Sequence, residues 1–451
     1  MLTALGIGFQ GFVPIAYADF GTPDGGVRRH QEAAQASATG WAVGPNISHG
    51  VIWMVEKTLD LLVVGAGISG LGLARMAQRR GCSCLVVEGG SHIGGVINSH
   101  RFDTPEGEMW AELGAHTCYN SYGNLLQLLE ESGQLDTLQA KEKLRFWMQT
   151  GERLTSIPSQ LNILELLGVL PRLLLQRKAG RSAKDYFGGV IGRRNYRQVL
   201  GPALDAVACQ PAGDFPAEAL FRKKPRRKEI MRSYTGPRGL HSFVDGMAQG
   251  LDIRFRAPAV AIEREASGYR VALGNGESLL AARLALAVAP DIAAKLLRES
   301  MPDLARRLAE IGMAEIDSRA VLLRADVTSL PRLAGIIGRC DDFYSVVSRD
   351  PIPDGSYRAF TFHFQPDRLD EAGQRSRICR VLGIEEPQLL ANASVRNRLP
   401  ALRLDQSERM AWVDSRLQGE GLGLTGNWFQ GLSIEDCLIR SASEARRLLD
   451  S

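Results

Sequence analysis

The sequence predicts an α/β protein of two or three domains, on the basis of its length, its composition and one strand–glycine turn–helix pattern. The chain has 451 residues, and domains average about 100–200 residues. Hydrophobic residues make up 45% and charged residues 23%, which excludes a largely disordered or fibrous chain. The formal net charge of +4 is too small to indicate nucleic acid as a partner.

The N-terminal pattern begins with the apolar run 59–64 and continues as a helical pattern to Ala77. The turn between them consists of Gly65, Ala66, Gly67, Ile68, Ser69 and Gly70. Glycines at this spacing allow a tight turn, a close approach of backbone N–H groups to a pyrophosphate, and close packing of helix on strand. Glu88 ends the next expected strand, 84–87, at about the spacing where an acid binds ribose hydroxyls. We therefore expect a Rossmann-like dinucleotide site without a 2′-phosphate, because a plain structural turn leaves Glu88 unexplained.

A Gly-Gly pair follows a few residues after Glu88, and it points to a family. Gly94 and Gly95 precede Val96, and the stretch resembles the flavin-containing amine oxidase and protoporphyrinogen oxidase superfamily. In that superfamily a Gly-Gly doublet, usually followed by Arg or Lys, touches the diphosphate of FAD. The resemblance implies non-covalent FAD. Val96 in place of a cation leaves the diphosphate to backbone donors and the helix dipole.

Residues 421–437 are similar to the closing motif of the same superfamily, a strand, a Gly-Asn or Gly-Asp pair and a final helix. The resemblance implies that Gly426 and Asn427 lie at the flavin, with Asn427 on the ribityl chain. It also implies that the helix start near Ile434 faces the N1 edge of the flavin, where backbone N–H groups favour negative charge. Gly-Asn is closer to the protoporphyrinogen oxidase branch than to the amine oxidases.

A middle block completes the resemblance. Residues 236–247 resemble the lead into a helix, 253–262 and 269–273 are expected to be a strand pair, and 284–288 a strand before Pro290. Ala259 matches the position that meets the adenine. The resemblance thus implies a FAD domain built from 54–133, 236–300 and 416–451.

The remaining segments are expected to form an α+β substrate domain, from 134–235 and 301–415. The first is expected to be helical and membrane-facing, and the second to hold strands at 321–323 and 359–362, with His363 as a structural residue. The Leu-rich segment 161–175, broken at Pro171, ends in a group of cations. It is either membrane-facing or a buried helix pair with a solvated basic end.

Three further features bound the function. The cations at 222–228 are expected to be a solvated face, with headgroup binding or guidance of a carboxylate-bearing substrate as alternatives. Seven scattered cysteines predict reduced buried thiols, no metal site and a reducing compartment. Residues 1–53 are expected to be a disordered leader or a start artefact, because Met54 directly precedes the first strand and no basic signal region is present. We expect a cytoplasmic protein, with contact on the inner face of the membrane left open.

The resemblance implies FAD-dependent dehydrogenation of a bulky apolar small molecule, foremost a porphyrinogen to a porphyrin with oxygen as acceptor. The alternatives are a carotenoid- or squalene-type desaturase, an amine oxidase, and a non-redox protein that binds FAD. No Ser-His-Asp or Cys-His set is apparent. The sequence therefore assigns no catalytic residue and leaves the oligomeric state open.

Overall fold

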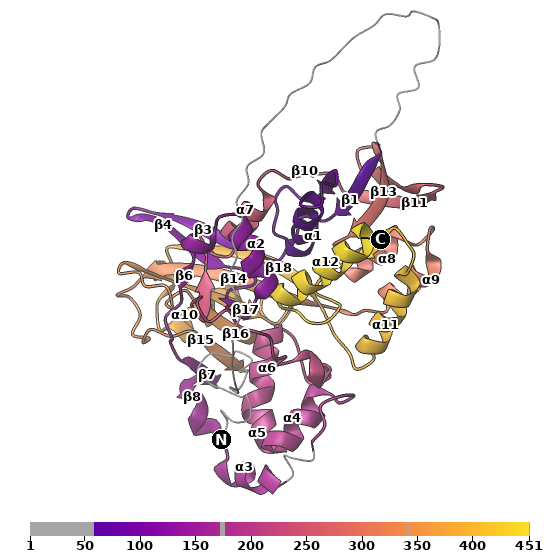
Figure 1. Cartoon of the computed structure of the whole chain (residues 1–451). Helices are drawn as coiled ribbons and strands as arrows, with labels where there is room; N and C mark the ends of the chain where they lie inside the picture. The colour runs from indigo at the N-terminus through magenta and orange to yellow at the C-terminus, as the bar shows by residue number, and fades with distance from the viewer. Residues whose placement is uncertain (1–57, 172–175, 341, 451) are drawn as a thin grey trace, which may run out of the picture.

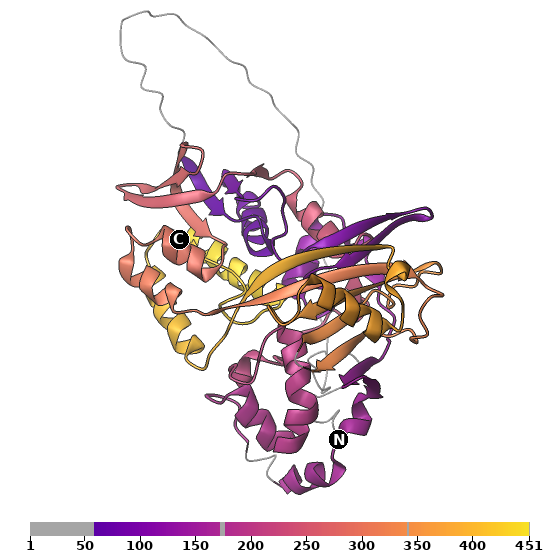
Figure 2. The ribbon, with the colours of Figure 1, turned by 180° about the vertical axis from the view of Figure 1, so that it is seen from behind.

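The computed structural model describes residues 58–171, 176–340 and 342–450. The expectation for residues 1–53 falls outside this range, as do residues 172–175 of the Leu-rich segment. Within the described residues, the strands form two sheets of seven strands and two smaller sheets. Figures 1 and 2 show, from opposite sides, the second seven-stranded sheet lying between the nucleotide-binding part and a group of helices.

The first sheet has the order β10-β2-β1-β13-β12-β11, with β19 beside the end of β13. Its strands are β1 (Leu59–Val64), β2 (Cys84–Val87), β10 (Asp252–Arg254), β11 (Ala259–Glu265), β12 (Gly268–Leu273), β13 (Ser278–Leu286) and β19 (Leu422–Leu424). The pairs of β1 with β2, β1 with β13, β2 with β10 and β13 with β19 are parallel, whereas β11, β12 and β13 are antiparallel. Three distant chain segments therefore share one sheet.

Helices cover both faces of this sheet, because the last four residues of β1 are apolar and buried and point alternately to the two faces. Leu61 and Val63 face one core, while Leu62 and Val64 face the other. The first core holds α1 (Ile68–Gln78), α2 (Gly123–Glu131), α7 (His241–Ala248) and α12 (Ile434–Leu449). The second holds α8 (Pro290–Leu296), α9 (Pro302–Ala309) and α11 (Gln406–Leu417). The result is the doubly wound, Rossmann-like arrangement that the sequence predicted.

Two sequence expectations for this region are corrected. Residues 253–262 are not one strand, because Arg256 adopts φ 53° and Pro258 cannot donate a ladder hydrogen bond, so β10 and β11 are separate. Helices α9 and α11 were expected with the substrate domain. Their apolar faces instead pack on the first sheet, through Leu308 and Val413 among others.

The second sheet has the order β18-β14-β17-β16-β15-β7-β8. Its strands are β7 (Phe146–Thr150), β8 (Arg153–Ser156), β14 (Met313–Arg324), β15 (Gly335–Arg339), β16 (Phe343–Ser348), β17 (Tyr357–Phe364) and β18 (Ala391–Pro400). Both expected strands, 321–323 and 359–362, lie within it. Helix α10 (Glu371–Leu382) packs on Phe360 and Phe362 of one face. The hairpin β3 (Ser99–Thr104) and β4 (Gly107–Glu112) packs on part of the other.

The segment 134–235 is less helical than expected, since β7 and β8 belong to the second sheet. A small sheet joins β5 (Cys118–Tyr119), β9 (Ser233–Thr235) and β6 (Gln139–Ala140). The helices are α3 (Ile163–Val169), α4 (Ala183–Ile191), α5 (Arg193–Asn195) and α6 (Gly201–Ala208), with a π-helical turn at Tyr196–Leu200. Short 3₁₀ turns lie at Leu135–Thr137, Ile157–Gln160, Ala217–Ala219 and Glu386–Gln388.

Helix α3 lies at the tip of the helical part, away from the first sheet (Figure 1). It exposes Ile163, Leu164 and Leu167, at 58%, 80% and 52% of their surfaces, and buries Leu166. The alternative of a buried helix pair is therefore wrong for this helix. In the described part of the chain, no helix is both long and apolar enough to cross a bilayer.

All seven cysteines lie in described residues, and each is a free thiol. Cys118 and Cys437 are buried. The other five are only partly buried, which corrects the expectation that all seven are core residues.

Candidate active site

The first glycine turn contains two glycines that the fold requires and one that leaves space. A Cβ on Gly65, where φ is +105°, would lie 2.6 Å from the Ala287 carbonyl oxygen. A Cβ on Gly70 would lie 1.9 Å from the Gly65 oxygen. A Cβ on Gly67, in contrast, would meet no described atom within 4 Å. The open side of Gly67 is thus free for a ligand.

Helix α1 begins at this open position. Gly67 is its N-cap, without a side-chain cap, so the N–H groups of Ile68, Ser69 and Gly70 have no partner within the helix. Such N–H groups, together with the helix dipole, favour an anion. The arrangement fits a pyrophosphate, as the sequence predicted.

Glu88 lies against the same turn. Its Oε2 accepts a hydrogen bond from the Ala66 N–H at 2.8 Å, and its Oε1 accepts one from the Gly90 N–H at 2.7 Å. Each carboxylate oxygen keeps a second lone pair for a ribose hydroxyl. Ala259, the residue expected to meet the adenine, is the first residue of β11. Just before it, the Ala257 N–H donates a hydrogen bond to the Glu88 carbonyl at 2.9 Å.

The second glycine pair contacts the first turn. The Gly94 N–H donates to the Ala66 carbonyl at 2.9 Å, and a Cβ on Gly95 would lie 3.5 Å from the Gly67 Cα. Both residues have positive φ values, +105° and +59°. Val96 follows with 36% of its surface exposed. The structure therefore brings both glycine segments of the prediction to one place.

The closing motif reaches the same region from the C-terminal side. Gly426 has φ +154°, and a Cβ there would lie 2.6 Å from the indole nitrogen of buried Trp428. Asn427 and Ile434, the first residue of α12, line a large cavity. Glu435 anchors this helix start, because its carboxylate accepts hydrogen bonds from the backbone of Asn124 at 3.0 Å and of Leu125 at 3.2 Å.

The large cavity has a volume of about 610 Å³. Residues of the nucleotide-binding part, of the second sheet and of the helical part all line it. Val96, Asn427 and Ile434 line it from the nucleotide-binding part. The second sheet and the helical part supply mostly apolar walls, among them Ile316, Ile336, Leu399, Leu402, Leu204, Val207 and Phe221. A cavity of this size is in the range that holds a cofactor ring or a drug-sized ligand.

A polar row interrupts the apolar wall. Ser318, His363 and Ser345 are direct cross-strand partners on β14, β17 and β16, and all three line the cavity. His363 Nδ1 lies 3.0 Å from Ser318 Oγ, to which Asn397 donates at 3.3 Å. Burial lowers the pKa of His363 to about 4, so the ring is neutral at pH 7. His363 thus lies at the site, although its sequence setting suggested only a structural residue.

The basic run at 222–228 is only partly a solvated face. Lys224 lies 2.7 Å from Asp436 Oδ1 of α12, with 15% of its side chain exposed, and it lines the large cavity together with Arg222. Arg227 pairs with Glu130 at 2.8 Å. Lys223 and Lys228 are exposed as expected.

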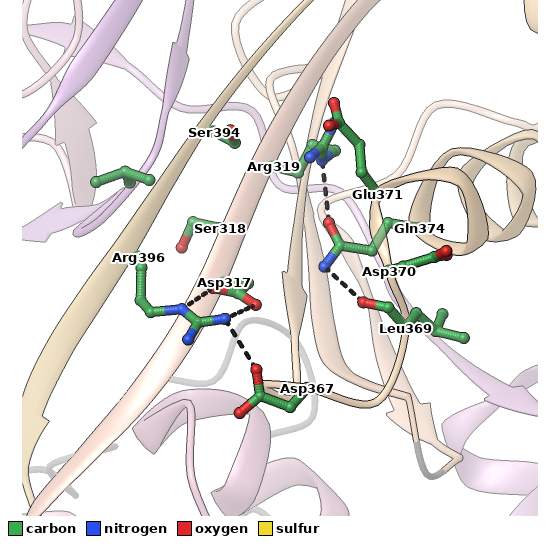
Figure 3. A pocket seen from close by; sticks show the side chains of 11 residues that line it. Asp317, Ser318, Arg319, Asp367, Leu369, Asp370, Glu371, Gln374, Ser394 and Arg396 are labelled. Carbon is green, nitrogen blue, oxygen red and sulfur yellow. Dashed lines mark hydrogen bonds and ion pairs between the residues drawn. The ribbon is translucent and has the colours of Figure 1, made fainter.

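A second pocket, of about 570 Å³, opens between β14, β18 and the start of α10 (Figure 3). Arg396 pairs with Asp317 at 2.7 Å and with Asp367 at 3.3 Å, and Arg319 bonds Gln374 at 3.1 Å. Its charged side chains already bind one another, and only Ser318 also lines the large cavity. We therefore place the active site in the large cavity.

The fold and the glycine turns define a dinucleotide-binding protein, and the comparisons with known proteins agree. A family model for an NAD(P)-binding Rossmann-like domain matches residues 63–132, and one for flavin containing amine oxidoreductase matches residues 141–362. The chain belongs to this superfamily of flavin-containing amine oxidoreductases, and FAD is its cofactor. The residues that would hold FAD are those of the two glycine segments, Glu88, Asn427 and the start of α12.

Individual relatives are distant. The chain is 36% identical over 87 residues to a 15-cis-phytoene desaturase of Narcissus pseudonarcissus, which is 19% of this chain and 15% of the relative. It is 24% identical over 256 residues to polyamine oxidase 2 of Arabidopsis thaliana, 52% of each chain. These alignments thus span 15% of the desaturase and 52% of the polyamine oxidase. A crystal structure of a candidate protoporphyrinogen oxidase from Exiguobacterium sp. 255-15 has a TM-score of 0.70 at 18% identity, over 87% of this chain and 99% of that one, which shows the shared fold.

The polar cavity-lining residues that the sequence did not predict are Ser318, Asn397, His116 and Lys141. They come from separate strands and loops, and no local motif marks them. Only cross-strand register and loop packing bring them to the cavity.

Proposed function

We propose that this FAD-dependent oxidoreductase oxidises a bulky, largely apolar substrate, and that the substrate is a porphyrinogen, which is converted to the porphyrin with oxygen as electron acceptor. The observation that carries the proposal is the composition of the 610 Å³ cavity wall. Apolar side chains form most of it, and five basic side chains lie among them, Lys141, Lys143, Arg222, Lys224 and Arg232. A porphyrinogen combines an apolar tetrapyrrole body with carboxylate side chains, which suits both features.

When bound, FAD accepts two electrons and one hydrogen from the substrate. The chain's own residues would then orient the substrate. Neutral His363, with Ser318 and Asn397, presents hydrogen-bonding groups in an otherwise apolar wall, and these groups can bind pyrrole N–H groups. The apolar side chains of the second sheet exclude water from the reacting face.

Charge reversal at the cavity tests the substrate class. Lys143 and Arg232 are exposed cations of the lining, so Lys143→Glu and Arg232→Glu should each raise the KM for protoporphyrinogen IX while leaving FAD content unchanged. Lys228→Glu, an exposed cation outside the lining, serves as the matched control. Phytoene and putrescine are the alternative probes. Turnover of either one, with none of the porphyrinogen, would replace the proposal by a desaturase or an amine oxidase.

We also propose that the helical part docks on a membrane surface, from which an apolar substrate can enter the cavity. The exposed Ile163, Leu164 and Leu167 on α3 support this. Val207 of α6 is 58% exposed and lines the cavity in the same helical part. Leu164→Glu with Leu167→Glu should abolish flotation with anionic liposomes. Leu390→Glu, at a leucine that is 51% exposed away from α3, should float normally, and equal flotation of all three proteins would refute membrane docking through α3.

A further inference from the structure

A third cavity, much smaller than the two described above, lies directly behind the wall of the large one. Its volume is about 10 Å³, which is room for about one water molecule. Trp110, Glu112 and Arg349 line it, and His116 and Lys141 line both cavities. These last two residues therefore form the partition between the substrate cavity and a buried polar site.

Lys141 is held in this partition by two hydrogen bonds. Its Nζ donates to the His116 carbonyl at 2.8 Å and to Thr117 Oγ1 at 2.9 Å. A neutral amine has two N–H groups and one lone pair, so these two acceptors satisfy both N–H groups and leave the lone pair free. Burial lowers the pKa of Lys141 to about 8, although the Glu112 carboxylate acts in the opposite direction. About a tenth of the amine is therefore neutral at pH 7, and the neutral fraction rises steeply toward pH 8.

Glu112 lines the small cavity together with Lys141. Its Oε2 accepts from Ser99 Oγ at 2.6 Å and its Oε1 from the Leu240 N–H at 2.7 Å. Burial raises the pKa of Glu112 to about 7, against the effect of these hydrogen bonds. An acid and a base of similar proton affinity thus face one cavity, and a proton can move between them at little cost.

Two buried donors on the same cavity mark a place for water. Trp110 Nε1 and Arg349 Nε have no hydrogen-bond partner among the described residues, although both side chains line the small cavity. A buried polar group without a partner is costly. A water molecule in the small cavity would accept hydrogen bonds from these donors.

We propose that Lys141 is the proton acceptor of the substrate cavity, and that Glu112, which lines the small cavity with it, stabilises its protonated form. The inference rests on the proposed function. Oxidation breaks two bonds to hydrogen in the substrate: both electrons and one hydrogen go to FAD, and the other hydrogen leaves as a proton. The lone pair of Lys141 takes this proton, and the ammonium that forms keeps its hydrogen bonds to the His116 carbonyl and Thr117 Oγ1, while the Glu112 carboxylate stabilises its charge. No other oxidant is required.

The charged and titratable groups around Lys141 support this protonation behaviour. His116, on the loop after β4, stays neutral because burial and Lys141 lower its pKa to about 3. The remaining neighbours are Glu112 of β4, Cys118 of β5 and Arg349 after β16. Of these, the Glu112 carboxylate favours the ammonium form and the Arg349 guanidinium favours the neutral amine.

The first experiment needs no substrate. Acylation of Lys141 by acetic anhydride, followed by mass spectrometry across a pH series, reports the fraction of neutral amine, and exposed Lys143 in the same peptide calibrates the reagent. We expect a midpoint near pH 8 for Lys141. Glu112→Gln should move it to lower pH, because the carboxylate that favours the ammonium is lost. A midpoint above pH 10 in the wild type would overturn the inference, whatever the substrate.

The second experiment follows anaerobic flavin reduction by protoporphyrinogen IX. The wild-type rate should rise with pH through about 8. Lys141→Arg keeps a cation and N–H donors but cannot lose its proton, so it should slow reduction by about 10²–10⁴-fold, as should Lys141→Met, with FAD content unchanged. Lys228→Arg is the matched control. Wild-type reduction by Lys141→Arg would exclude a proton acceptor at this position. Absence of reduction in the wild type would count against the porphyrinogen substrate, and the acylation midpoint would still decide the role of Lys141.

Discussion

Substitution of Gly67 and of Gly70 separates a glycine that makes room for the cofactor from one that lets helix and strand pack. A Cβ on Gly67 meets no described atom within 4 Å, and its φ of −75° and ψ of 177° suit any residue. Gly67→Val should therefore change the free energy of unfolding of the FAD-free protein by no more than about 0.5 kcal/mol. Gly70→Ala places a methyl group 1.9 Å from the Gly65 oxygen and 3.1 Å from the Ala287 Cβ. Gly70→Ala should therefore lower the free energy of unfolding by at least about 1–3 kcal/mol, because the added methyl group overpacks the contact between helix and strand.

Added FAD should separate the two variants further. A ligand present at 100 times its Kd stabilises the folded state by about 2.7 kcal/mol, so FAD should raise the Tm of the wild type. It should not raise the Tm of Gly67→Val, whose methyl groups would occupy the open side of the turn. Denaturant titration without FAD and thermal unfolding with FAD measure both effects. Stabilisation of Gly67→Val by FAD to the wild-type extent would refute the assigned site.

Three other predictions concern single residues. Val96→Arg, at an exposed position beside the glycine pair, should tighten FAD binding by about 1.5–3 kcal/mol through a charge-assisted hydrogen bond to the diphosphate. An unchanged Kd would mean that this loop does not approach the diphosphate. Asn427→Asp places a negative charge at the flavin site, worth about 4 kcal/mol at 4 Å and an effective dielectric of 20, and should lower the flavin reduction potential by up to roughly 90 mV. Photoreduction with a reference dye measures it, and a change in substrate affinity alone would move Asn427 to the substrate pocket. Burial lowers the pKa values of His116 and His363 to about 3 and about 4, below about 6.5 in the unfolded chain. The unfolded chain therefore binds more protons between these values, and the free energy of unfolding should fall as the pH drops from about 6.5 toward 4. His363→Gln should flatten this dependence in denaturant titrations at pH 7 and 5, and an unaltered slope would contradict it.

The residues assigned to the candidate nucleotide site were predictable from the sequence because each depends on local geometry. Gly65 and Gly70 are required within one strand–turn–helix unit, and Glu88 ends the next parallel strand. The second glycine pair and Gly426 also adopt positive φ values. Each of these patterns lies within a short run of consecutive residues, so no tertiary information was needed to find it.

The substrate side could not be predicted in the same way. Ser318 and His363 meet only because β14 and β17 pair in one register, and a shift of β17 by one residue would turn His363 away from the cavity. Lys141 reaches Thr117 because two loops pack together. Lys224 was expected in solvent, but its ion pair with Asp436 of α12 depends on the return of the C-terminal segment to the active site.

The most direct test of the account is anaerobic addition of protoporphyrinogen IX to the FAD-loaded protein, with flavin absorbance and porphyrin fluorescence recorded together. We expect the flavin to bleach as porphyrin fluorescence appears, with a fixed ratio between the two signals. Oxygen should then restore the oxidised flavin. A flavin that stays oxidised with the porphyrinogen, or that is bleached by putrescine or phytoene instead, would contradict it.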